Sequence, residues 1–210
     1  MVNAGALLDH CDALSGQAAL HAAADAGYSD VVALLAQRGA ALDARSTRDL
    51  RTPLMLAAQA GHVECVARLL ERGADALARD IESITALHCA ARIGGMRIVE
   101  LLLARQVDVN AASVDGWTPL HVAAADNAIG IAAMLLQRGA RMDACTIDGR
   151  TALHVAAQCG GVVVAALLAK RGANLRNAID GGWTPELLAA ANGHERLAQY
   201  LRTLRALNKE

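Results

Sequence analysis

Residues 115–124, Asp115-Gly116-Trp117-Thr118-Pro119-Leu120-His121-Val122-Ala123-Ala124, decide the fold, because variants of their Thr-Pro-Leu-His core return along the whole chain. Counted from the position that Thr occupies here, successive variants are 34 residues apart once and 33 residues apart four times. The other variants are Ala18-Ala19-Leu20-His21, Thr52-Pro53-Leu54-Met55, Thr85-Ala86-Leu87-His88, Thr151-Ala152-Leu153-His154 and Thr184-Pro185-Glu186-Leu187. A fixed period of this length indicates stacked repeats rather than an ordinary globular domain.

Each position of the period has a local structural reason. Thr is a good N-cap, Pro is tolerated at the first helical position, and a Gly such as Gly61 ends a short helix in the left-handed conformation. A second apolar run with helical spacing follows, for example 63–71, and another Gly ends it. The Asp-Gly pair before the next Thr predicts a turn at the tip of a short hairpin finger. One repeat is therefore helix, turn, helix and finger, and it buries its apolar faces only by stacking on neighbours.

The pattern from Asp115 to Ala124 resembles the ankyrin repeat, and the resemblance covers roughly residues 16–202. It implies an all-α solenoid of stacked helix-turn-helix units with hairpin fingers, and a concave surface formed by the fingers and first helices. It also implies a non-catalytic scaffold that binds another protein or peptide. We expect a lead-in at 1–16 and one domain over 17–210, with repeats at about 17–50, 51–83, 84–116, 117–149, 150–182 and 183–210.

Several repeats depart from the pattern. The first finger is one residue longer and carries Asp49-Leu50 in place of Asp-Gly, so we expect an altered tip. Asn127 replaces a turn Gly, and Asn tolerates positive φ. Gln106 replaces a cap Gly and tolerates positive φ poorly, so we expect a distorted helix end there. Glu186 stands at a leucine position in the last repeat, where we expect a polar outer side that caps the stack.

Composition excludes several classes of function. The net charge of -1 leaves no basic excess for nucleic acid, and no apolar run is long enough to span a membrane. The first residues form a poor secretion signal, and the five cysteines show no CxxC spacing. We therefore expect a cytoplasmic or nuclear monomer that is not secreted and has no cofactor, metal site or catalytic residues. Cys65 and Cys89 lie on apolar helix faces, whereas Cys145 and Cys159 are the more exposed thiols.

The resemblance places the partner surface on the last finger positions, the finger tips and the first helices. Trp and Arg dominate the energetics of protein interfaces, and exposed aliphatic side chains often mark a binding site. Trp117 and Trp183 either contact a partner or pack on neighbouring fingers, and both readings stay open. The candidate residues are Arg48, Arg51, Ile81, Ile84, Arg92, Val114, Trp117, Ile147, Arg150, Gln158 and Trp183.

Three other hypotheses accompany this surface. The chain could be the ankyrin module of a larger regulatory protein such as a methyl-lysine reader, which needs converging aromatic rings. Asn110 resembles the ankyrin asparagines that an asparaginyl hydroxylase modifies. A recurring arginine either offsets the negative end of a helix dipole or contributes to an anion-binding ladder. That arginine occurs as Arg38, Arg72, Arg105, Arg138 and Arg171.

Overall fold

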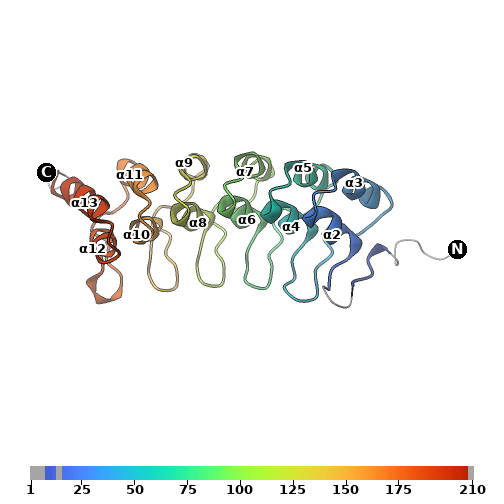
Figure 1. The fold of residues 1–210 in the computed structure, drawn as a ribbon, viewed down its shortest axis with the longest axis horizontal. Coiled ribbons are helices and arrows are strands. Elements are labelled where there is room, and N and C mark those ends of the chain that lie inside the picture. The colour runs from blue at the N-terminus through green and yellow to red at the C-terminus, as the bar shows by residue number, and fades with distance from the viewer. Residues whose placement is uncertain (1–7, 13–15, 208–210) are drawn as a thin grey trace. The chain divides into compact units, whose positions relative to one another are not determined.

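The computed structural model describes residues 8–12 and 16–207, and the helices in this part form six consecutive pairs (Figure 1). A first helix and a second helix make up each pair, and each finger leads into the next first helix. One short 3-10 turn, Asp180–Gly182, lies in the last finger, where Ile179 and Trp183 form an isolated β-bridge. The pairs are α2 Ala19–Asp25 with α3 Ser29–Gln37, α4 Pro53–Ala60 with α5 Val63–Glu71, α6 Ala86–Arg92 with α7 Met96–Leu103, α8 Pro119–Ala125 with α9 Ile129–Gln137, α10 Ala152–Gln158 with α11 Val162–Lys170, and α12 Pro185–Ala191 with α13 Glu195–Leu207.

The helix ends follow the predicted rules. The hydroxyl of Thr52 accepts a hydrogen bond from the backbone N–H of Met55 at 3.4 Å, with Pro53 at the first helical position. Gly61 ends α4 with φ of 82° in the left-handed region. Helices of seven to nine residues, such as α6 and α5, are marginal alone in water. Their stability must therefore come from packing against neighbouring helices.

Contacts divide the chain into two compact units, residues 1–108 and 109–210. Within the first unit, α4 packs between α2 and α6, and α5 packs against α3 and α7. Within the second, α10 packs against α8 and α12, and α11 packs against α9. The paired alanines of the first helices are fully buried, as Ala57, Ala58, Ala156 and Ala157 show. These small side chains let neighbouring helices approach closely. The single domain over 17–210 stays a prediction, and most of the lead-in lies outside the described residues.

The departures from the repeat behave largely as predicted. Asn127 adopts φ of 51°, and Leu50 adopts φ of 59° at the altered first finger tip. There the extra residue is accommodated because the N–H of Leu50 bonds to the carbonyl of Ser46, four residues back. Gln106 is held at φ of 56°. When the two repeats are aligned, α7 ends one residue earlier in its repeat than α5 does. The predicted distortion of this helix end is confirmed.

The prediction for Glu186 is wrong. We expected this residue to give the last repeat a polar outer side, but its side chain is only 6% exposed. The side chain lies against α13, which is longer than the other second helices. Arg202 and Arg205 of that helix approach its carboxylate to 2.8 and 3.0 Å. The charge is buried because an adjacent helix brings two guanidinium groups to it.

Among the described residues, no helix is both long enough and apolar enough to cross a membrane.

Candidate functional site

The motif histidines link one repeat to the next. The backbone N–H groups of Thr85, Thr118 and Thr151 each donate to Nδ1 of the histidine three residues on, at 3.2 Å. Nδ1 is thus the acceptor, which leaves the proton on Nε2. From there His121 donates to the carbonyl of Arg150 in the next finger at 3.0 Å.

Burial sets the protonation state of these histidines. His21, His121 and His154 are almost fully buried, and desolvation lowers their pKa below the usual value for histidine. No group of three or more His, Cys, Asp or Glu side chains is placed to hold a metal ion within residues 8–12 and 16–207. The geometry gives the motif histidines a structural role.

Two candidate arginines are held by their own unit. Arg51 pairs with Asp80 at 3.3 Å and donates to Oε1 of Gln59 at 2.6 Å. Arg150 makes the matching bond to Gln158 at 2.8 Å. Both arginine side chains are partly exposed, at 24% and 31%. Both arginines are already ordered at the start of a first helix, so binding a partner there would cost little side-chain conformational entropy.

Trp117 and Trp183 occupy the same finger position as these arginines, but the first helix that follows them lacks the glutamine with which the arginines bond. Eight residues after Arg51 and Arg150 the chain has Gln, whereas eight residues after Trp117 and Trp183 it has Ala. Trp117 is half-buried, with its ring centroid 6.0 Å from that of His121. Trp183 remains 42% exposed. Trp117 therefore packs in part on its own repeat, and Trp183 presents the larger free surface.

The finger tips expose aliphatic side chains. Ile81, Val114 and Ile147 are 61%, 65% and 77% exposed. Backbone bonds tie neighbouring fingers, because Ile81 N–H donates to the carbonyl of Asp49 and Ile147 N–H to that of Asp115. The tips therefore present apolar side chains on a hydrogen-bonded support.

The other candidates on this surface differ in exposure. Arg48 at the first finger tip and Arg92 at the end of α6 are exposed. Ile84 and Gln158 are half-buried.

Aromatic rings do not converge in the described part of the chain. The ring pair found there is Trp117 with His121. Tyr28 belongs to the first unit and Tyr200 to α13. A methyl-lysine cage needs several aromatic faces around one cation, and the described residues bring no such set together.

Asn110 belongs to a series of side-chain bonds that sequence reasoning missed. Its Oδ1 accepts from the N–H of Arg141 at 2.8 Å, and its amide donates to the carbonyl of Gly139 at 3.2 Å. Asp9 and Asp43 accept in the same way from Ala41 and Asp75, one repeat on, at 2.8 Å. We call these bonds the inter-loop rungs. Hydroxylation of Asn110 stays a prediction. The side chain that it would modify already forms one of the inter-loop rungs.

The recurring arginines sit where the helix-dipole interpretation places them. Four of them are C-cap residues of second helices, namely Arg38, Arg72, Arg138 and Arg171.

The cysteines separate as predicted. Cys65 and Cys89 are buried, and Cys145 and Cys159 are exposed. Desolvation raises the pKa of Cys89 to about 11.

The repeat period, the helix pairs and the Thr-His caps all agree with one family. A family model for ankyrin repeats (3 copies) matches residues 2–80, 74–146 and 139–208. None of the curated proteins compared with the chain matches it. Because the family model covers nearly the whole sequence, the chain belongs to the ankyrin repeat family.

Proposed function

We propose that the chain is a protein-interaction scaffold that binds a partner protein on its fingers and first helices, without catalysis. Ankyrin repeats are generally protein-interaction modules, which supports the broad assignment. The finer proposal places the contact on the finger tips and on the last finger positions. In this proposal the scaffold acts as a monomer in the cytoplasm or nucleus.

The exposed apolar finger tips are the observation that carries this proposal. Val114 and Ile147 are held by fingers that are tied through backbone bonds, yet their side chains are mostly exposed. An exposed isoleucine gains hydrophobic free energy only when something covers it. Trp183 adds a large side chain that is 42% exposed in the same unit. Aromatic and aliphatic anchors beside an ordered Arg150 have the composition of an interface centre.

A matched pair of variants tests the site. Wild type, the double variant Ile147→Ala with Trp183→Ala, and the control Val163→Ala would be compared in cross-linking pull-downs. Val163 of α11 is 46% exposed, so its truncation removes a similar aliphatic surface from a second helix. Far-ultraviolet circular dichroism would first confirm that all three chains are folded.

The proposal expects one partner that wild type and Val163→Ala capture and that the double variant loses. Loss of a hot-spot pair should weaken the purified complex at least about tenfold in a titration. Equal affinity of the double variant would place the partner elsewhere on the molecule and reject the finger surface.

A further inference from the structure

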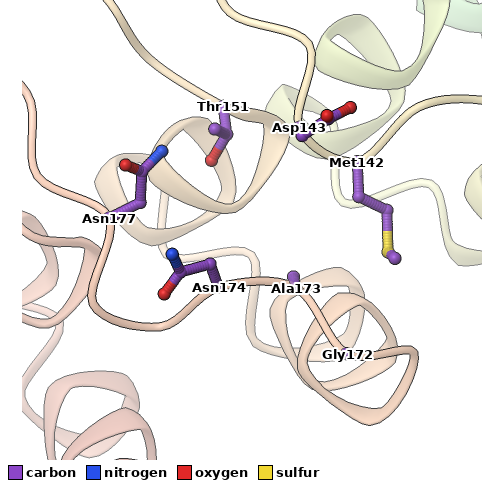
Figure 2. Close-up of a pocket in the computed structure, with 7 residues that line it drawn as sticks. All are labelled: Met142, Asp143, Thr151, Gly172, Ala173, Asn174 and Asn177. Atoms are coloured by element: carbon purple, nitrogen blue, oxygen red, sulfur yellow. The ribbon is translucent and has the colours of Figure 1, made fainter.

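A cleft of about 430 Å³ lies in the second unit, between the loop that follows α9 and the loop that follows α11. Met142 and Asp143 line one side, and Gly172, Ala173 and Asn174 line the other, with Asn177 and Thr151 beside them. Figure 2 shows the side chains of Asn174 and Asn177 facing the Thr151 side of the cleft, while the carboxylate of Asp143 points away from them. The cleft is separate from the finger tips that carry the proposed function.

The cleft occurs where an inter-loop rung is missing. Asp143 follows Gly139 by four residues, as Asp43 follows Gly39, so it stands in the rung position. Its carboxylate instead pairs with Arg141 at 3.2 Å. The oxygen that would fill the space beside Asn174 is thereby turned outward.

The amides in the cleft break the repeat as well. Asn177 stands where four other repeats have an alanine, namely Ala44, Ala78, Ala111 and Ala144. The backbone carbonyl of Asn177 accepts from Nε2 of His154 at 3.1 Å, which holds the residue in place. Oδ1 of Asn174 accepts from the N–H of Arg176 at 2.9 Å, so its NH₂ group is the end that faces a ligand. Two amides with free donors are therefore positioned on one side of the cleft.

Several arginines lie around the cleft. A shallower groove of about 220 Å³ shares Ala173 and Asn174 with the cleft and is also lined by Arg176 and Arg205. Arg141 lies at the other side through its pair with Asp143, and Arg171 directly precedes Gly172. Asp143 is the carboxylate among the residues that line the two depressions. Because Arg205 also pairs with Glu186 at 3.0 Å and Arg141 with Asp143, the guanidinium group that the groove offers to a ligand is that of Arg176. Amide donors beside this guanidinium group favour an anion over a cation.

We propose that this cleft and groove bind a short acidic segment of a partner protein. One carboxylate side chain enters the cleft and accepts from the amides of Asn174 and Asn177, and a second carboxylate meets Arg176 in the groove. A peptide fits better than nucleic acid because the chain as a whole carries a net charge of -1, which provides no basic excess to hold an extended polyanion. The missing rung and the replaced alanine turn one loop of the repeat into a binding site.

Fluorescence anisotropy with a labelled peptide of alternating glutamate and glycine tests the proposal on the full chain. The neutral peptide of alternating glutamine and glycine is the matched probe, and a single-stranded oligonucleotide of equal charge is the competitor. The variants are Asn177→Ala, which restores the residue of four other repeats, and Arg176→Glu. Arg72→Glu is the control, because it makes the same charge change on a helix end of the first unit.

We expect salt-dependent binding of the acidic peptide and none of the neutral one. Arg176→Glu should weaken that binding by about tenfold or more, and Asn177→Ala by about threefold to tenfold, with Arg72→Glu close to wild type. Absence of binding would overturn the proposal. Equal loss in Arg72→Glu would also overturn it, since binding would then follow diffuse charge. An oligonucleotide that displaces the peptide at lower concentration would assign the cleft to nucleic acid instead.

Discussion

Glu186 shows how one residue can depart from the repeat and still be satisfied. The equivalent leucines, Leu120 and Leu153, are each 1% exposed, and Glu186 is buried to a similar extent. Burying a carboxylate costs several kcal/mol, and an ion pair offsets this cost only with good geometry. Arg202 and Arg205 supply that geometry from α13 and remain 60% and 36% exposed themselves. The pair therefore selects a particular placement of the last helix more than it adds net stability.

Replacing Glu186 with leucine should leave stability unchanged or raise it by up to about 1 kcal/mol, because the apolar residue of the repeat returns and both arginines can extend into water. Replacing it with alanine should cost about 1–3 kcal/mol, through the cavity and the lost pair. Urea unfolding followed by circular dichroism measures both. A leucine variant as unstable as the alanine variant would show that the ion pair itself holds α13 in place.

Predictions from the sequence were better for features that depend on the residue itself and its chain neighbours, and worse for features that depend on residues far away in the sequence. The positive φ of Asn127 was predicted correctly because it depends on the residue itself, whereas Gln106 adopts a positive φ that its residue type was expected to tolerate poorly. The burial of Glu186 was missed because its partners belong to a helix that lies outside the motif. The inter-loop rungs were missed for a similar reason, since Asp43 and its donor Asp75 lie 32 positions apart. The amides of the cleft could have been suspected from Asn177, which alone replaces a recurring alanine.

At the scale of elements, the motif histidines of α2, α8 and α10 cap these first helices and couple them to the next repeat. The cap requires neutral imidazole, because protonated Nδ1 could not accept from the backbone N–H of the cap residue. Burial lowers the pKa of His21, His121 and His154, so below pH of about 6.5 the unfolded chain binds more protons than the folded one. The stabilisation is complete above the ordinary histidine pKa and is lost as the pH falls from that value to the lowered pKa of the folded state.

We therefore expect the melting temperature to be level between pH 8 and 7 and to fall steadily from about pH 6.5 to 5. Asp49 and Asp148 have lowered pKa values, so these carboxylates are protonated only at more acidic pH and do not contribute to this slope. Scanning calorimetry across this range measures the slope. The variant His121→Gln should be less stable at neutral pH. Its stability should fall less steeply with acid, because unfolding would take up about one proton fewer than in wild type. Parallel slopes in the two proteins would mean that this histidine does not carry the pH dependence.

At the scale of the molecule, stability should be distributed rather than uniform. Helices of seven to nine residues pack on the other helix of their own repeat and on neighbouring repeats, and the contacts separate units 1–108 and 109–210. In such an array, each repeat depends on its own stability and on the interfaces with its neighbours. A change in the last repeat should therefore leave the first unit closed, and the buried thiols offer a way to observe this.

Cys65 and Cys89 report on the first unit, because both are buried and the raised pKa of Cys89 suppresses its thiolate. Native-state alkylation, read by mass spectrometry, should label Cys145 and Cys159 first and these two only through opening of α5 and α6. Glu186→Ala should leave the labelling rate of Cys65 and Cys89 within about twofold of wild type, since the damage stays near α12 and α13. The control Val66→Ala truncates a fully buried side chain next to Cys65 in the sequence. It should increase the labelling rates of both Cys65 and Cys89, because it destabilises the first unit directly. If Glu186→Ala accelerates Cys65 and Cys89 as much as Val66→Ala does, the chain opens as one cooperative body, and the local account of its stability is wrong.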